Sequence, residues 1–211
     1  YKDSGNSAFG TAVVGTVSGD SISFGTPVVF NSNNTAESTA EYDPASERVI
    51  IAYRVSNAGT VIAGGVLGSS ISFGAPTTYD SKSSSQATFA YDSKEGRALL
   101  AYRTDYNPKG GNVCTCIVDP SDNSISFGTK VRFTTTECFY PSMTYDPVAD
   151  KVVIAYFDQG SQTPFIVVGN VTDLGGSFGT PQQYESEALY GQKLTYDPVA
   201  NKHVIVYEVA S

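Results

Sequence analysis

The sequence is poor in the residues that catalytic sites use most. It has one histidine, three cysteines, one methionine and no tryptophan among 211 residues. Nucleophilic triads need a general base, which is usually a histidine, and the only one, His203, lies in an apolar segment beside Val204. We therefore expect no catalytic residue and no cofactor, and a protein that is not an enzyme.

The cysteines are too few and too irregularly spaced to organise the fold. Cys114, Cys116 and Cys138 contain no Cys-x-x-Cys pair, so they match neither a zinc site nor a disulfide framework. Two interpretations stay open. Cys138 forms one bridge with either of the other two, or all three are small buried thiols, which we favour. No metal site is expected.

Basic charge and long apolar runs are also scarce. Lys and Arg number 13 against 21 Asp and Glu, for a net charge of −8, and the basic residues form no stripe, which argues against nucleic acid as a partner. No apolar run reaches the eighteen or so residues that cross a bilayer, so we expect no membrane insertion. The low charged fraction, 16%, with abundant Gly, Ser, Thr, Asn and Tyr, favours a secreted protein or one at a particle surface.

What the sequence does have is an internal repeat. Three markers recur four times in the same order, at intervals of about fifty residues. The first is a strand-like segment that ends in a tyrosine, here called the repeat tyrosine: Tyr53, Tyr102, Tyr156 and Tyr207. The second is Ser-Phe-Gly, ending at Gly25, Gly74, Gly128 and Gly179, with an aromatic residue six positions after each Phe: Phe30, Tyr79, Phe133 and Tyr184. The third is Tyr-Asp, starting at Tyr42, Tyr91, Tyr145 and Tyr196, with Pro next in three of the four copies.

The pattern within each repeat predicts four short strands. An apolar residue lies two positions before each Tyr of Tyr-Asp, on the same face, which indicates a half-buried first strand: Ala40, Phe89, Met143 and Leu194. The segment before the repeat tyrosine is apolar throughout, as in a strand covered on both faces. Between them, Asp-Pro is typical of a tight turn.

A repeated four-stranded unit of about fifty residues predicts an all-β chain, a β-propeller of four blades in a single domain, 1–211. The repeats run approximately over 1–52, 53–101, 102–155 and 156–206. Tyr1 corresponds to Tyr53, and the chain ends just after Tyr207, in the same phase. We therefore expect the N-terminal and C-terminal strands to pair and close a four-bladed ring. The alternatives are that these residues form part of a larger propeller, or that two chains share one ring.

The segment 18–30, Ser-Gly-Asp-Ser-Ile-Ser-Phe-Gly-Thr-Pro-Val-Val-Phe, together with Tyr-Asp-Pro and Arg-Val-Ile-Ile-Ala-Tyr-Arg, resembles a group of tandem-repeat, propeller-like proteins. These are proteins of marine organisms and surface or tail proteins of phages and bacteria. The resemblance covers the whole chain. It implies the architecture and an extracellular or surface setting, and it carries no catalytic residue.

The segments that join successive blades differ in every repeat, which is how a fixed scaffold acquires a ligand. We expect these inter-blade loops at 31–37, 80–86, 134–140 and 185–191. The candidate ligand-binding residues are Phe139, Tyr140, Tyr190, Arg54, Arg103 and Asp158. Aromatic rings there would stack on sugar rings or on a partner protein.

The predicted function is recognition of a glycan or a protein. The alternative is an architectural subunit that assembles with itself or with another structural protein in a filament, matrix or virion tail. A third, weaker idea is sugar hydrolysis, which needs two facing carboxylates, and Asp3, Asp105, Asp158 and Glu208 are its candidates.

Overall fold

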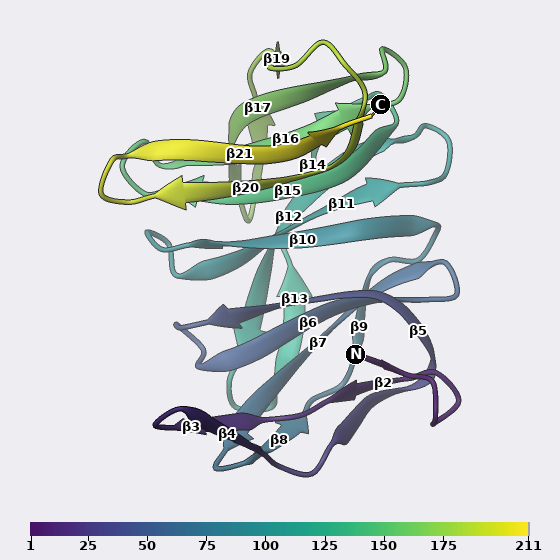
Figure 1. The fold of residues 1–211 in the computed structure, drawn as a ribbon, viewed down its shortest axis with the longest axis vertical. Helices are drawn as coiled ribbons and strands as arrows, with labels where there is room; N and C mark the ends of the chain where they lie inside the picture. Colours follow the sequence, from purple (N-terminus) through teal and green to yellow (C-terminus); the bar gives the residue numbers. More distant parts are fainter. Residues whose placement is uncertain (211) are drawn as a thin grey trace. The chain divides into compact units, whose positions relative to one another are not determined.

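The computed structural model describes residues 1–210, which form antiparallel strands and turns and no helix (Figure 1). The predicted all-β class is therefore confirmed. The chain divides into two compact units. Unit 1 comprises Tyr1–Lys82 and Val118–Ser126, and unit 2 comprises Ser83–Ile117 and 127–210. Within residues 1–210, no helix is available that is long and apolar enough to cross a membrane.

The strands are short, and their bounds follow the repeat. The first nine are β1 (Lys2–Asp3), β2 (Phe9–Ala12), β3 (Gly15–Ser18), β4 (Ser21–Phe24), β5 (Val28–Asp43), β6 (Arg48–Val55), β7 (Ala58–Leu67), β8 (Ser70–Phe73) and β9 (Thr77–Asp80). The next five are β10 (Ser84–Asp92), β11 (Arg97–Thr104), β12 (Gly110–Asp119), β13 (Ser124–Phe127) and β14 (Val131–Thr134). The last seven are β15 (Cys138–Asp146), β16 (Lys151–Asp158), β17 (Thr163–Thr172), β18 (Gly175–Phe178), β19 (Gln182–Gln183), β20 (Leu189–Asp197) and β21 (Lys202–Val209).

Each complete repeat forms a meander. Two inner strands form a hairpin, a third strand pairs with the second, and the fourth is broken into two pieces that both pair with the third. The sheets follow the orders β10-β11-β12-β13 with β14 on β12, and β15-β16-β17-β18 with β19 on β17. In unit 1 the same meander is β5-β6-β7-β8 with β9 on β7, extended by β1 and β2. Two further two-stranded sheets are β3-β4 and β20-β21.

In unit 2 the inner hairpins pack face to face, with β15 beside both β10 and β20 (Figure 1). Neighbouring hairpins share apolar clusters, described below, so the core of this unit lies between the sheets as well as within them. Because side chains alternate along a strand, every second residue of each inner strand points into one of these apolar clusters.

The Tyr-Asp motif makes the inner-hairpin turn, as predicted. In each repeat one carboxylate oxygen, Oδ1, of the Asp accepts a hydrogen bond from the backbone N–H two residues on, at 2.9–3.1 Å: Asp43 from Ala45, Asp92 from Lys94, Asp146 from Val148 and Asp197 from Val199. This is the local bond through which Asp favours a turn over continued strand.

The Ser-Phe-Gly motif allows close packing between consecutive repeats. A Cβ at Gly128 would collide with the Thr115 hydroxyl and the Asp173 backbone, and one at Gly25 or Gly74 would likewise meet the backbone of the next repeat's outer turn. Glycine is needed there because the backbones approach too closely for a side chain. Gly179 has no such close neighbour.

The aromatic residue after Ser-Phe-Gly packs on the repeat tyrosine of the following repeat. Ring centroids lie 5.1 Å apart for Phe30 and Tyr53, and 5.7 Å apart for Phe133 and Tyr156. The same pairing joins Tyr184 and Tyr207 at 5.6 Å. Such edge and tilted contacts are the favoured geometries of aromatic pairs.

Three expectations from the sequence need correction. The segment 31–37 lies inside the continuous strand β5, so the loop predicted there is wrong. Ala40 is exposed, whereas its equivalents Phe89, Met143 and Leu194 are buried. The strand before the repeat tyrosine is buried in β6, β11 and β16 but largely exposed in β21, which among the described residues has no third strand at its edge and no hairpin packed over Val204 and Val206.

Candidate functional site

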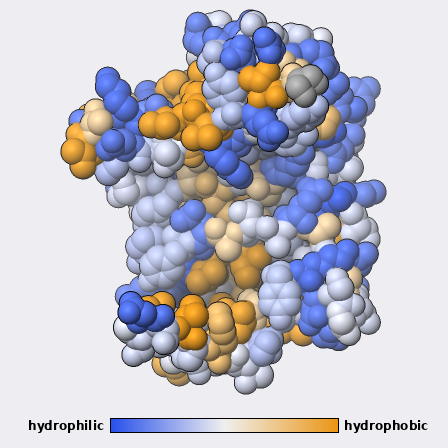
Figure 2. Space-filling view, viewed as in Figure 1, coloured by the Kyte–Doolittle hydropathy of each residue, from blue (hydrophilic) through white to orange (hydrophobic). Residues whose placement is uncertain are grey.

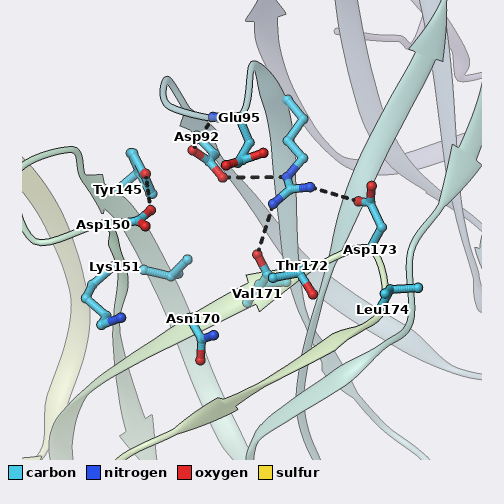
Figure 3. Close-up of a pocket in the computed structure, with 12 residues that line it drawn as sticks. Asp92, Glu95, Tyr145, Asp150, Lys151, Asn170, Val171, Thr172, Asp173 and Leu174 are labelled. Atoms are coloured by element: carbon cyan, nitrogen blue, oxygen red, sulfur yellow. Dashed lines mark hydrogen bonds and ion pairs between the residues drawn. The ribbon is translucent and has the colours of Figure 1, made fainter.

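Unit 2 contains a cavity of about 460 Å³ at the turn end of its inner hairpins, which we call the turn pocket (Figure 3). Arg97 reaches across it. Its guanidinium lies 3.5 Å from an oxygen of Asp92 and 3.2 Å from Oδ1 of Asp173, and it donates a hydrogen bond to the backbone carbonyl of Val171. The turn pocket is thus crossed by an ion pair that joins β11 to the turn after β17.

A second set of bonds occupies the other side of the turn pocket. The Tyr145 hydroxyl donates to Oδ1 of Asp150 at 2.7 Å, and the Lys94 ammonium lies 2.7 Å from the other oxygen. The hydrogen bond from Lys94 holds the pKa of Asp150 below its usual range, while burial raises the pKa of Tyr145. The groups that line this cavity are therefore engaged with one another.

Unit 1 uses an arginine at the same repeat position in the same way. Arg48 donates to the side chain of Asn123 at 2.5 Å and to the backbone carbonyl of Pro120 at 2.6 Å. Since the arginine recurs and each time ties a strand to a neighbouring turn, we interpret the turn pocket as a joint between repeats. It is the weaker of the two candidate sites in unit 2.

The opposite end of the inner strands in unit 2 forms the bulge pocket, a cavity of about 410 Å³. It is lined by Gln86, Ala87, Tyr140, Pro141, Gly191, Gln192 and Lys193. The first strand of each hairpin contributes at the place where its pairing register shifts: between Ser85 and Thr88 in β10, Phe139 and Ser142 in β15, and Leu189 and Gly191 in β20. Such bulges redirect side chains and are frequent beside binding sites.

Two of these bulge residues have left-handed backbone conformations. Gln86 and Tyr140 both have φ of 52°, and Glu37 has 51° at the same position in unit 1. This region is disfavoured for residues with a Cβ, and a bulky side chain held there is a sign of functional constraint. The position, five residues before the Tyr of Tyr-Asp, carries a different residue in every repeat, ending with Gly191.

Tyr140 lies at the centre of the bulge pocket. Its backbone N–H donates to the side-chain oxygen of Gln86 at 2.7 Å, and its carbonyl accepts from the side-chain amide of Gln192 at 3.1 Å. Tyr184 in turn donates its hydroxyl to the Gln192 oxygen, so that amide is fixed at both ends. Tyr140 is 38% exposed, so an aromatic residue whose backbone is fixed by two glutamine side chains is accessible to solvent.

Beside the bulge pocket, Arg103 organises a charged cluster. Its guanidinium lies 2.7 Å from Asp105 and 2.8 Å from Glu137, and it sits 3.7 Å over the centroid of the Phe139 ring. The Lys109 ammonium also contacts Glu137, at 2.7 Å. Arg103, Phe139 and Tyr140, three of the predicted site residues, are thus close together: Arg103 covers Phe139, and Phe139 is the neighbour of Tyr140 in β15.

The other predicted site residues have different surroundings. Tyr190, 57% exposed, lies in β20 between the paired residues Leu189 and Gly191, at the bulge. Asp158 is buried, and its carboxylate accepts from the backbone N–H groups of Gly160 and Ser161, which makes it a turn residue. Arg54 is in unit 1, 2.9 Å from Glu37.

Two of the four carboxylates proposed for sugar hydrolysis, Asp105 and Asp158, have partners that hold the fold together. Asp105 is the ion-pair partner of Arg103, and Asp158 holds a turn. His203 accepts or donates at both ring nitrogens, toward the Thr144 hydroxyl at 3.0 Å and Asp146 at 3.3 Å, and so connects two hairpins.

The cysteines are free thiols and all are buried, in agreement with the favoured interpretation. Burial raises the pKa of Cys138 to about 12, so its thiol stays protonated and unreactive at neutral pH. Within 1–210, no group of three or more His, Cys, Asp or Glu side chains is arranged to hold a metal ion.

Gln86 and Gln192 are the pocket residues that the sequence analysis missed. Both lie near the start of a first strand, and the position of Gln86 carries a different residue in each repeat. Variability at one fixed position inside a strand is the signal that would have found it. A comparison with models of protein families gives no match for this chain, and one with curated proteins gives no significant match.

Proposed function

We propose that the repeats are blades of a β-propeller. The four-stranded meanders and the face-to-face hairpins of unit 2 support this. The blades would form a four-bladed ring, in one domain, closed by pairing of the N-terminal and C-terminal strands, or part of a larger propeller.

We further propose that the protein is a non-enzymatic recognition module of an extracellular or particle surface, and that the bulge pocket binds a glycan. The observation that carries this is Tyr140, a partly exposed aromatic residue whose left-handed backbone is held by hydrogen bonds to the side chains of Gln86 and Gln192. Sugar sites combine an aromatic face with a few fixed polar groups, and Lys193 adds a donor to the lining. The likeness to tandem-repeat surface proteins is consistent with this setting.

The test is a panel of immobilised neutral and acidic oligosaccharides, with any binder measured by calorimetry. Tyr140→Gly removes the ring and suits the left-handed backbone, so it should fold normally and weaken binding at least about tenfold. Glu37→Gly makes the equivalent change at the bulge of unit 1 and should leave binding unchanged. If no oligosaccharide binds with better than millimolar affinity, the glycan proposal fails. Equal weakening by both variants would place the site outside the bulge pocket.

A second function is favoured by a separate observation. Val204 and Val206 expose an apolar face on β21, at positions that are buried in β11 and β16. This supports an architectural subunit that packs with itself or with another structural protein.

A further inference from the structure

Unit 2 shows how one repeat covers the next. Leu99 and Ala101 of β11 belong to the same buried cluster as Met143 of β15 and Ile154 of β16. We call the residues three and one before the repeat tyrosine the forward face. The residue two before the Tyr of Tyr-Asp and the residue two before the repeat tyrosine form the rear face. The forward face of the second hairpin thus packs on the rear face of the third.

The next pair of hairpins follows the same rule. Val153 and Ala155, the forward face of β16, form a cluster with Leu194 of β20, and Ile205 of β21 packs against it. Two successive junctions therefore use equivalent residues in the same orientation.

The forward face of the last hairpin has no such cover. Val204 is 48% exposed and Val206 is 67% exposed, whereas the equivalent Val153 is 3% exposed and Ala155 is fully buried. Figure 2 shows hydrophobic side chains gathered over β21 and its turn. The sheet edge of β21 is also free of a third strand among the described residues. This hairpin therefore presents both an apolar face and unpaired backbone groups.

Unit 1 carries the complementary surface. Ala40 is exposed, and with Val49 and Ile51 it lines an apolar slot of about 460 Å³, also bounded by Phe30 and by 11–14. Ala40 and Ile51 are the rear face of the first inner hairpin. Ile51 is buried, as its equivalent Ile154 is, whereas Ala40 is exposed and its equivalent Met143 is buried under a forward face. Figure 2 shows hydrophobic side chains around a hollow in this unit.

The edge beside the slot has a matching register. In the complete repeats the second strand pairs with the third, as Ala52 with Val61 and Arg54 with Gly59. At the start of the chain, β1 takes only one end of the place that the second strand has in a complete repeat. There Lys2 pairs with Gly10, as Arg54 pairs with Gly59. Among residues 1–210 no strand pairs with the edge from Ala12 onward, and the repeat register places Val206 opposite Ala12.

We propose that the forward face of the β20-β21 hairpin of one copy docks into the apolar slot of a second copy. The occupant is identified by the chain's own junctions, in which an inner hairpin of this repeat covers the rear faces of the third and fourth hairpins. Each copy carries one forward face and one slot, so copies join head to tail, and such contacts form rings or filaments. Added strand pairing along β3 supplies backbone hydrogen bonds as well as apolar burial. The inference rests on the architectural form of the proposed function, replaces closure of the ring within one chain by pairing between copies, and is independent of glycan binding.

The first experiment measures mass against concentration by light scattering after gel filtration. The wild type should rise from 22.3 kDa toward multiples of that mass. Val206→Asp and Ala40→Asp, both at exposed positions, should shift the association at least about tenfold toward the monomer. Val199→Asp, at a 91% exposed position in the turn of the same hairpin, should behave as the wild type. Glycan binding should be the same in all three variants.

The second experiment identifies the source of the hairpin by disulfide trapping. When Ala12→Cys and Val206→Cys single variants are mixed and oxidised, a species of twice the chain mass should form. The native cysteines are buried and should not contribute. A wild type that stays monomeric at all concentrations would overturn the proposal. So would an Ala12→Cys, Val206→Cys double variant that crosslinks only within one chain, because the chain's own hairpin would then fill the slot.

Discussion

The third and fourth inner hairpins of this chain share a sequence pattern and differ in their surroundings. The repeat tyrosine of β16, Tyr156, is buried, whereas Tyr207 of β21 is 39% exposed. Burial raises the pKa of Tyr156, while the pKa of Tyr207 is raised first by its hydrogen bond to Glu185. Both hairpins form with the same turn and bulge. The local pattern is therefore sufficient for the hairpin, and burial of its forward face depends on a neighbour.

The same contrast appears in the outer strands. Gly128 is pressed against the turn of the following repeat, whereas a Cβ at Gly179 would meet only the Val168 carbonyl oxygen, at an ordinary van der Waals distance. The motif Ser-Phe-Gly is identical at both places. Glycine is therefore required by close packing at 128 but not at 179. The same substitution made at each position tests this difference.

The largest effect is expected from removing apolar volume on the two forward faces. Val153→Ala deletes two methyl groups from a buried cluster and should lower the free energy of unfolding by about 2 kcal/mol. Val204→Ala makes the same change at the exposed equivalent and should lower it by less than about 0.5 kcal/mol at low protein concentration. Urea unfolding followed by circular dichroism measures both. Equal losses would mean that β21 is covered as β16 is.

An effect of comparable size is expected from the two glycines. Gly128→Ala forces a methyl group against the Asp173 backbone and should destabilise the protein by about 1–3 kcal/mol. Gly179→Ala should change stability by no more than about 0.5 kcal/mol, since its surroundings are open. Thermal unfolding of the two variants makes the comparison. Equal destabilisation would show that a further outer turn packs on Gly179 in solution.

Much of the fold could be predicted from the sequence because the repeat markers act locally. Asp43 and Asp92 accept turn hydrogen bonds, and the pattern before Tyr102 makes a buried strand. The structure of the segments between the markers was harder to predict. The segment 31–37 is rich in Asn, Ser and Thr, typical of a loop, yet it belongs to β5 because it pairs with β2 on one side and with β6 further along.

The candidate site was predicted only in part. Aromatic side chains in variable segments pointed to Phe139 and Tyr140, and the structure brings them together with Arg103. The left-handed bulge that holds Tyr140, and the glutamines from two other hairpins, depend on packing between hairpins that no local pattern records. Asp158 was predicted from its place just after the repeat tyrosine, but one of its carboxylate oxygens, Oδ1, accepts the hydrogen bonds of the turn that follows it.

The most direct test of the account is amide hydrogen exchange in 153–156 and 204–207 as a function of protein concentration. Residues 153–156 belong to a covered inner strand, so their amides should exchange slowly at every protein concentration. At low concentration those of 204–207 should exchange at least about tenfold faster, and they should slow as copies associate. Protection of 204–207 equal to that of 153–156 at the lowest concentration would contradict the account.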